Sequence, residues 1–466
     1  MPQGRRKVPF SGKQKKEQLS KKRNTKQTVP NIGGDNEQTV TSKFDDHVAE
    51  PEEESKIIDK VTSQTKATKN DYMVDVNFSS GNTGRQKYDL IFQKESKEEI
   101  MKNKELVRKP LKMADPKDLE MDIDQLFPEG KCDYPSRPTW DSKMSKDQVE
   151  SNEAKYFRKY VNDIMIQNEQ NLSYFELNLE TWRQLWRVTE MADILLLIVD
   201  SRFPTAMVPP SLIVNLAPKP VILVLNKIDL IPPELALAWR TYFTEKFSNV
   251  KKVTFFTSYP AYNLRKQPYA EEQGGQHGLQ GKKLRGRILM AKEGAIQIVD
   301  AVNECTQDLD GEKVDIASWR EKIASVSSKD VGMEEELVKK IDEENKAIIT
   351  LGMIGAPNVG KSSLINSLMG KVVVSVSKTP GHTKHFQTIF ITPSVKLVDC
   401  PGLVFPSIVP KRLQVILGSF PIAQTRDPLS VVQYLAERID LPSILKLELP
   451  KDRSKWTTYD ICEGKL

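Results

Sequence analysis

Residues 355–363 have the types and the spacing needed to bind phosphate. They read Gly-Ala-Pro-Asn-Val-Gly-Lys-Ser-Ser and lie between an apolar run and a helix-like run. Gly355 and Gly360 allow the backbone to curl, so that N–H groups at a helix N-terminus converge on anionic oxygens. Lys361 can reach the outer phosphates, and the Ser362 hydroxyl suits Mg²⁺. The segment predicts a nucleoside triphosphate site, with an ordinary glycine-containing loop as the alternative.

A second motif follows a predicted buried strand and indicates which base is bound. Residues 221–225 are all apolar, which is typical of a parallel strand covered on both faces, and Asn226-Lys227-Ile228-Asp229 follows directly. Ligands of open α/β sheets bind at the carboxyl ends of strands. A carboxylate there can accept hydrogen bonds from N1–H and the 2-amino group of guanine, whereas adenine would leave Asp229 unpaired. The motif predicts guanine; the alternative is a charged turn after a strand.

Three shorter motifs complete the predicted site. Asp399, at a strand end, precedes Gly402; in P-loop NTPases such an Asp holds Mg²⁺, usually through water, and the glycine amide bonds the γ-phosphate. Thr383, in a turn before Asp399, is the candidate for a second hydroxyl on Mg²⁺. Thr257 and Ser258 end another apolar strand and are candidates for backing the guanine, with a plain strand end as the alternative. The predicted nucleotide-binding residues are Asn226, Lys227, Ile228, Asp229, Thr257, Ser258, Gly355, Asn358, Val359, Gly360, Lys361, Ser362, Ser363, Asp399 and Gly402, and the predicted Mg²⁺ ligands are Ser362, Thr383 and Asp399.

These motifs occur in an unusual order along the chain. The Asn-Lys-x-Asp motif comes first, followed by the Thr-Ser pair, the phosphate-binding loop, Thr383 and Asp399. The set matches the five guanine-nucleotide motifs of Ras-like GTPases, in which the phosphate loop leads. It therefore indicates a circular permutation, which compact domains tolerate because their termini usually lie close together. The chain resembles the circularly permuted GTPases linked to ribosome assembly.

Further strings support this resemblance and narrow it to one branch. Residues 178–187 and Asp-Ser-Arg-Phe-Pro at 200–204 fit the family; residues 9–16 and 134–140 are similar to its eukaryotic branch, which contains guanine nucleotide-binding protein-like one and the large-subunit GTPase of late pre-60S particles. Members of this branch generally continue well beyond the segment equivalent to 456–462, so we expect a shortened C-terminal region. Tyr259 stands where the guanine-backing motif usually has alanine.

The resemblance implies an α/β fold, a circularly permuted Ras-like P-loop GTPase domain whose mostly parallel sheet has helices on both faces. We expect a largely disordered region at 1–130 (a basic arm at 4–26 plus a polar linker), a helical lead-in at 131–191 packed on the GTPase domain, the permuted GTPase domain at 192–405, and a small helical C-terminal region at 406–466. Aromatic residues at helical spacing are expected to pack against the sheet; they are Tyr156, Phe157, Tyr160, Trp182 and Trp186.

Hydrolysis is expected to be slow. Leu403 stands where Ras-like enzymes place the Gln that orients the attacking water, and it can neither donate nor accept a hydrogen bond. Catalytic contributions are assigned to Lys361, Thr383 and Gly402. We expect help from a partner or from K⁺, for which Asn358 is the candidate ligand; the alternative for Asn358 is a hydrogen bond to its own loop. The chain is interpreted as a GTP-hydrolysing switch, with a non-enzymatic GTP/GDP-gated interaction protein as the alternative.

Basic residues are concentrated at the N-terminus. The chain has 69 Lys and Arg against 63 Asp and Glu, a net charge of +6, but residues 4–26 hold ten basic residues and one acidic residue. Such arms bind phosphate backbones or act as nuclear or nucleolar signals, and a solubilising tail is the alternative. We expect a pre-ribosomal particle, with its RNA and ribosomal proteins, as partner, and no DNA specificity. A second candidate RNA contact comprises Lys282, Lys283, Arg285 and Arg287, with the solvated start of a helix as an equal alternative.

The remaining composition bears on the compartment. The four cysteines are widely separated and form no metal-binding pattern, which fits a reducing cytosol or nucleus. There is no apolar run of about 18 residues and no signal-peptide pattern. We therefore expect a nuclear, nucleolar or cytoplasmic protein that is neither secreted nor membrane-bound.

Overall fold

The computed structural model describes most of the second of two compact units, Val74–Leu466. Several predictions fall on residues outside the described part of the chain; they concern the basic arm at 4–26, Thr383 and Tyr259. The described residues are 90–168, 171–258, 279–307, 316–325, 349–370, 373–374, 376, 387–451 and 453–464.

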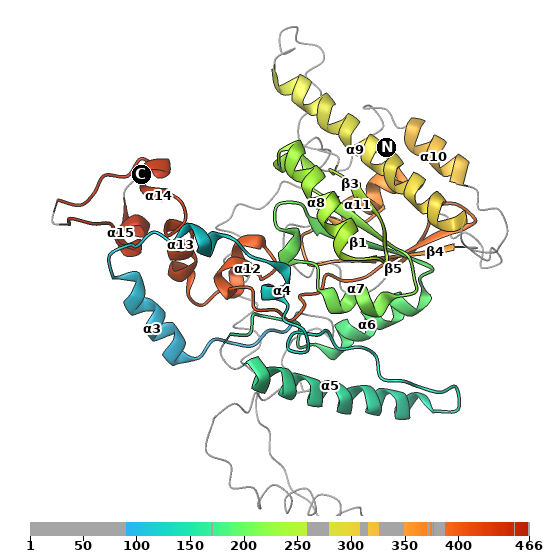
Figure 1. Ribbon diagram of the computed structural model, residues 1–466, viewed down its shortest axis with the longest axis horizontal. Coiled ribbons are helices and arrows are strands. Elements are labelled where there is room, and N and C mark those ends of the chain that lie inside the picture. The colour runs from blue at the N-terminus through green and yellow to red at the C-terminus, as the bar shows by residue number, and fades with distance from the viewer. Residues whose placement is uncertain are drawn as a thin grey trace, which may run out of the picture. The chain divides into compact units, whose positions relative to one another are not determined.

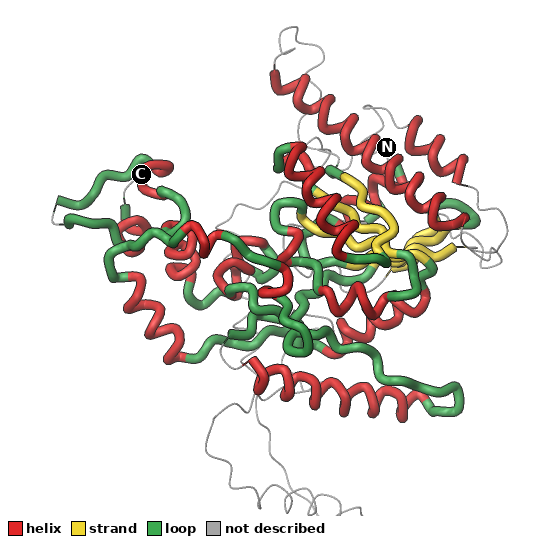
Figure 2. The backbone as a smooth tube through the Cα atoms, in the orientation of Figure 1, coloured by secondary structure: helices red, strands yellow, loops and turns green. Residues whose placement is uncertain are grey.

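A six-stranded sheet forms the centre of this unit (Figures 1 and 2). The strand order is β3-β2-β1-β4-β6-β5, and every neighbouring pair is parallel except β5 and β6. The predicted mostly parallel sheet is therefore confirmed. The strands are β1 (Ile194–Asp200), β2 (Val221–Asn226), β3 (Val250–Phe255), β4 (Ile349–Ile354), β5 (Gln387–Phe390) and β6 (Val395–Asp399).

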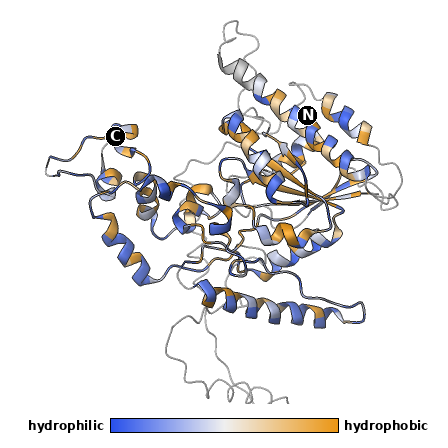
Figure 3. Cartoon of the chain, viewed as in Figure 1, coloured by the Kyte–Doolittle hydropathy of each residue, from blue (hydrophilic) through white to orange (hydrophobic). Residues whose placement is uncertain are grey.

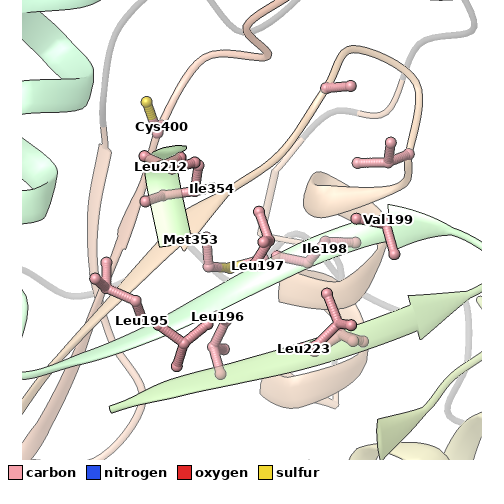
Figure 4. Close-up of a cluster of buried hydrophobic side chains, with 14 of the residues drawn as sticks. Leu195, Leu196, Leu197, Ile198, Val199, Leu212, Leu223, Met353, Ile354 and Cys400 are labelled. Atoms are coloured by element: carbon pink, nitrogen blue, oxygen red, sulfur yellow. The ribbon is translucent and has the colours of Figure 1, made fainter. Parts of the chain in front are cut away.

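The inner strands are buried along their whole length, because apolar side chains on both faces have helices to pack against. Every residue of β1, β2 and β4 is buried. The hydropathy colouring shows these strands as the apolar centre of the unit (Figure 3). In the close-up, consecutive β1 side chains such as Leu196 and Leu197 lie among Leu223, Met353 and Ile354 (Figure 4). The core thus holds the strand ends in a fixed register.

Helices cover both faces of the sheet. Helices α6 (Leu179–Met191) and α7 (Pro210–Leu216) lie on one side in Figure 1, and α9 (Leu279–Gln307) and α10 (Ile316–Ser325) lie on the other. Gly352 of β4 permits the close approach of α6, since a Cβ atom there would lie 2.7 Å from the Ala192 side chain. Helix α9 packs on β2 and β3 and also on α11 (Lys361–Met369), while α8 (Pro233–Lys246) packs on β3.

The helical lead-in packs as expected from its aromatic spacing. Phe157 of α5 (Lys146–Asn168) is fully buried and contacts Trp182 of α6, whose ring in turn meets Phe405. Trp186 is also buried and donates from Nε1 to the Pro135 carbonyl at 2.8 Å. The lead-in therefore covers the segment that follows β6.

Part of the expected linker is structured, which corrects the prediction for residues 90–130. Helix α3 (Lys97–Val107), the short 3-10 helix η1 (Pro116–Leu119) and α4 (Ile123–Leu126) form there. Leu111 donates its N–H to the Trp456 carbonyl at 2.8 Å, and α3 packs on α13. These partners lie more than 300 residues further along the chain, so the local composition does not reveal that this polar segment is ordered. The C-terminal helices are α12 (Lys411–Leu417), α13 (Pro428–Ala436), α14 (Leu441–Leu445) and α15 (Thr458–Glu463).

No helix among the described residues is long and apolar enough to cross a membrane. The domain boundaries at 131, 192 and 406 stay predictions.

Candidate functional site

The predicted motifs meet at the carboxyl edge of the sheet. The phosphate-binding loop runs from the end of β4 into α11, the Asn-Lys-x-Asp motif follows β2, and Asp399 ends β6. Asn226 donates from Nδ2 to the Val359 carbonyl at 2.5 Å, although 133 residues separate them. The lysine-serine turn and the Asn-Lys-x-Asp turn are therefore in direct contact.

Two glycines shape the phosphate-binding loop. Gly360 has a φ of 102°, and a Cβ atom there would lie 2.2 Å from Nδ2 of Asn226. Gly355 has a φ of 157°, and its Cβ would lie 2.3 Å from the Ile198 carbonyl oxygen. Gly355 is therefore required by the close approach of the β1 backbone, and Gly360 by its left-handed φ and by the nearby Asn226 side chain.

The Lys361 side chain is fixed inside the phosphate-binding loop by hydrogen bonds. Its side chain is buried, and Nζ donates to the carbonyls of Gly355 and Ala356, both at 2.9 Å. Burial lowers the pKa of Lys361, an effect that the nearby Asp399 opposes. Lys361, Ser362 and Ser363 open α11, so the helix N-terminus adds its partial positive charge at the same place. This arrangement suits a polyanionic ligand.

The donor set near Asp399 fits a hard cation. Asp399 is buried, and its Oδ1 atom has no hydrogen-bond partner within the described part of the chain. Burial raises the pKa of Asp399 to about 6, and Lys361 opposes the shift. A carboxylate oxygen of Asp399 and the hydroxyl oxygen of Ser362 are the kind of ligand that Mg²⁺ prefers. Thr383, the other predicted ligand, lies outside the described residues.

Gly402 lies against the phosphate-binding loop. A Cβ atom at Gly402 would be 2.7 Å from the Pro357 Cα and 3.1 Å from Nζ of Lys361. The Leu403 N–H donates to the Gly355 carbonyl at 3.3 Å, while the Leu403 side chain is fully buried. That side chain lines a cavity of mixed polarity together with Phe127, Ala356, Phe405, Gln414 and Leu417. Leu403 therefore contributes packing and no polar group to the site.

Thr257 and Arg287 hold the carboxylate expected to read the base. Asp229 Oδ1 accepts from the Thr257 hydroxyl at 2.6 Å, and Oδ2 pairs with Arg287 of α9 at 2.9 Å. A carboxylate has about four lone-pair positions, so each oxygen keeps capacity for a base. The Ile228 N–H donates to the Phe256 carbonyl at 3.2 Å, which joins this turn to the end of β3. Ser258 ends that described segment and is half-buried.

Arg287 also belongs to the candidate RNA contact, which stays a prediction; within the structure it pairs with Asp229. Its basic neighbours Lys282, Lys283 and Arg285 have side chains outside the described set. Sequence reasoning missed the Arg287–Asp229 pair because 58 residues separate them and no periodic pattern links the two. Lys227 also gains an unforeseen partner, Asp200 at the end of β1.

Asn358 connects the phosphate-binding loop to the C-terminal helices. It has a left-handed φ of 59°, and Nδ2 donates to the carbonyl of Gly418, the C-cap of α12, at 2.9 Å. The open alternative, a bond to its own loop, is thus replaced by a bond 60 residues away. Since the amide nitrogen faces Gly418, the amide oxygen faces the opposite way.

Such a loop and base motif on a parallel sheet, with the base motif earlier in the chain, define a circularly permuted P-loop GTPase. A family model described as 50S ribosome-binding GTPase matches residues 350–446. The chain is 42% identical over 413 residues to guanine nucleotide-binding protein-like 1 of Mus musculus, and 31% identical over 345 residues to GTPase LSG1-2 of Arabidopsis thaliana. The chain belongs to the circularly permuted GTPase family that includes these two proteins.

The matches cover different shares of each protein. The mouse match covers 81% of this chain and 66% of the relative, and the Arabidopsis match covers 71% and 55%. The chain thus spans about two thirds of the length of the mouse relative and about half of the length of the Arabidopsis relative. The crystal structure of GNP-bound YlqF from T. maritima gives a TM-score of 0.29 at 16% identity, covering 58% of this chain and 78% of that one.

Proposed function

We propose that the protein binds GTP and GDP, hydrolyses GTP slowly, and acts as a nucleotide switch in the assembly of the large ribosomal subunit. The observation that carries the proposal is the contact of Asn226 with Val359, because it joins the base-reading turn to the phosphate-binding loop in one site. The identity to guanine nucleotide-binding protein-like 1 and LSG1-2 supports the same assignment.

The residues divide the work of binding along the nucleotide. Backbone N–H groups of the loop and the start of α11 receive the phosphates, and Lys361 exchanges its two carbonyl partners for phosphate oxygens. Gly402 lies beside Lys361, which supports the proposal that its amide bonds the terminal phosphate. Asp399 and Ser362 would hold Mg²⁺, with Thr383 as the proposed third ligand; the ion would neutralise charge on the phosphates.

Hydrolysis is proposed to be slow because the chain offers no group at position 403 to orient water. Leu403 is buried among apolar side chains, so it cannot supply the hydrogen bond that Gln supplies in Ras-like enzymes. Unassisted Ras turns over at about 10⁻⁴ s⁻¹, and we expect a rate at or below that scale.

Replacing Na⁺ by K⁺ is expected to raise the rate of GTP turnover several-fold. The Asn358 amide is fixed by its bond to Gly418, so that its oxygen is preorganised as a ligand for a monovalent cation beside the phosphates. Single-turnover hydrolysis in matched KCl and NaCl measures the effect. Equal rates in the two salts would exclude this route.

Changing Asp229→Asn is expected to shift base preference from guanine to xanthine. The amide can donate to the 2-oxo group of xanthine but cannot accept both guanine donors, and a lost charge-assisted pair of about 1.5–3 kcal/mol lowers GTP affinity on the order of 10- to 100-fold. Equilibrium binding of GDP and XDP measures the shift. Asp163→Asn, an exposed carboxylate on α5, is the matched control. A variant that keeps wild-type GDP affinity would show that Asp229 is a surface turn residue.

The ribosomal partner is tested by adding purified pre-60S particles to the full chain. We expect the GTP-loaded protein to co-sediment more strongly than the GDP-loaded protein, and the particles to accelerate single-turnover hydrolysis. Tight nucleotide binding without any acceleration would favour the non-enzymatic, nucleotide-gated interaction protein. Equal co-sedimentation of the GTP-loaded and GDP-loaded protein would refute the proposed nucleotide switch.

A further inference from the structure

Asp200 is a buried carboxylate at the carboxyl edge of the sheet, beside the base-reading turn. It ends β1 and lies in register with Asn226 of β2, and its side chain is 1% exposed. Oδ1 accepts from the backbone N–H and Nε of Arg202, at 3.1 and 3.0 Å. Oδ2 accepts from the Arg202 guanidinium at 2.8 Å and from Nζ of Lys227 at 2.6 Å. All these donors belong to the turns that follow β1 and β2 at the carboxyl edge of the sheet.

The charge of Asp200 is maintained despite its burial. Desolvation alone would raise its pKa, but the hydrogen bonds from Arg202 and Lys227 outweigh it, and the pKa lies below its usual value. The two cations differ in exposure: the Arg202 side chain is 38% exposed and the Lys227 side chain 27%. Arg202 can therefore be hydrated from the solvent side, whereas Lys227 relies more on the carboxylate.

The backbone aims Lys227 at Asp200. Lys227 has a φ of 64°, in the left-handed region that non-glycine residues rarely adopt. The Lys227 N–H donates to Oδ1 of Asn226 at 2.7 Å, which supports this backbone conformation. Nζ of Lys227 then reaches Asp200, so the side chain links the end of β2 to the end of β1. Asp229, the carboxylate expected to read the base, follows two residues later in the same turn.

We propose that Asp200 is a positioning residue for base recognition, which acts by fixing the stem of Lys227 as an apolar wall of the guanine subsite. A free lysine side chain loses rotamer entropy when it is ordered. The ion pair with Asp200 orders the stem before the base arrives, so that this cost does not reduce affinity. The inference rests on the proposed function, since it assumes a guanine ligand.

A double-mutant cycle in the full chain tests whether Asp200 acts through Lys227. We measure GDP affinity by titration calorimetry for wild type, Asp200→Asn, Lys227→Met and the double variant. Each single variant is expected to weaken GDP binding about tenfold, and the double variant to be no weaker than Lys227→Met. The GTP hydrolysis rate at saturation is expected to stay within about twofold of wild type, while KM rises.

Arg202→Gln is the matched control, because it removes the other cation on the same carboxylate and leaves the Lys227 pair. We expect its GDP affinity to stay within about twofold of wild type. Additive effects of Asp200→Asn and Lys227→Met, wild-type affinity in Asp200→Asn, or an equal loss in Arg202→Gln would each overturn the inference. Should Asp200→Asn fail to fold, Asp200→Glu, which keeps the charge but displaces it, takes its place in the cycle: a loss of GDP affinity that disappears in the Lys227→Met background supports the inference, and an additive loss overturns it.

The outcomes also separate this inference from the proposed function. Wild-type protein that binds no guanine nucleotide would end both. Tight guanine-selective binding by wild type with additive single variants would end only the role of Asp200.

Discussion

Changing Lys361→Ala is expected to abolish retention of GTP and GDP while leaving the fold intact. The ammonium donates to two carbonyls at 2.9 Å, and phosphate oxygens would replace them through charge-assisted bonds. Two such bonds at about 1.5–3 kcal/mol each imply an affinity loss of at least about 100-fold. The measurement is nucleotide binding by calorimetry, with bound nucleotide also counted after gel filtration.

Stability distinguishes a lost ligand contact from a damaged fold. Lys361 is buried and its pKa is lowered by desolvation, so removing the ammonium removes a buried charge. The Gly355 carbonyl keeps a partner in the Leu403 N–H. We therefore expect the thermal midpoint without nucleotide to stay within about 2 °C of wild type. Lys252→Ala, which removes a surface pair with Glu304, is the control and should bind normally. A Lys361→Ala protein that still retains GTP would refute the assignment of the loop.

Changing Glu176→Gln is expected to stabilise the protein above pH 7 by a few kcal/mol. Glu176 is fully buried, and Oε1 accepts from the N–H groups of Ile91 at 3.0 Å and Asn178 at 2.8 Å. Its Oε2 atom has no hydrogen-bond partner among the described residues. Burial raises the pKa of Glu176 to about 8, which outweighs the backbone hydrogen bonds that lower it. The folded protein therefore holds this carboxyl protonated at neutral pH.

The sign of the pH dependence follows from that raised pKa. The group's contribution to folding stability is full below its ordinary pKa of 4.5 and is lost as pH rises through about 8. Glutamine imitates the protonated acid and keeps the acceptor at Oε1, so its stability advantage should grow between pH 5 and pH 8. At about 1.36 kcal/mol per unit the shift amounts to a few kcal/mol.

Urea unfolding of wild type and Glu176→Gln at several pH values between 5 and 9 measures this advantage. Glu245→Gln, an exposed carboxyl on α8, should follow the wild-type profile. Parallel profiles for wild type and Glu176→Gln would mean that the pKa of Glu176 is the same in the folded and unfolded states, which would contradict the prediction. The backbone N–H of Glu176 donates to the carbonyl of Val404, the residue after Leu403. Glu176 therefore lies next to the segment that follows β6.

Local patterns predicted those parts of the site that depend on a strand and the turn after it. The apolar runs before Asn226, Gly355 and Asp399 are strands, and parallel pairing necessarily brings their carboxyl ends to one edge. The motif order therefore predicted both the permuted topology and the convergence of the turns. Roles of individual side chains toward nucleotide and metal remain predictions, and Thr383 lies outside the described residues.

Contacts between distant segments were beyond sequence reasoning. Asn358 reaches Gly418, Arg287 reaches Asp229 and Glu176 is enclosed by Ile91, and none of these pairs leaves a periodic or local trace. The same limit explains the wrong prediction for residues 90–130, whose order depends on partners near residue 456. The Asp200–Arg202 string was visible as a family feature, but its link to Lys227 requires the β1–β2 register.

The permuted chain divides the sheet into two contiguous blocks with separate duties. Strands β1 to β3 carry the base-reading turns and strands β4 to β6 carry the phosphate-reading ones, and the blocks join in the sheet where Ile194–Leu197 pair with Leu351–Ile354. A bound guanosine nucleotide would thus act as a staple across this seam, adding its binding energy to the association of the blocks. If the chain is cut between the blocks, we expect the fraction of reassembled fragments to rise with the concentration of guanosine nucleotide. Such a pair of fragments would report the nucleotide concentration by complementation.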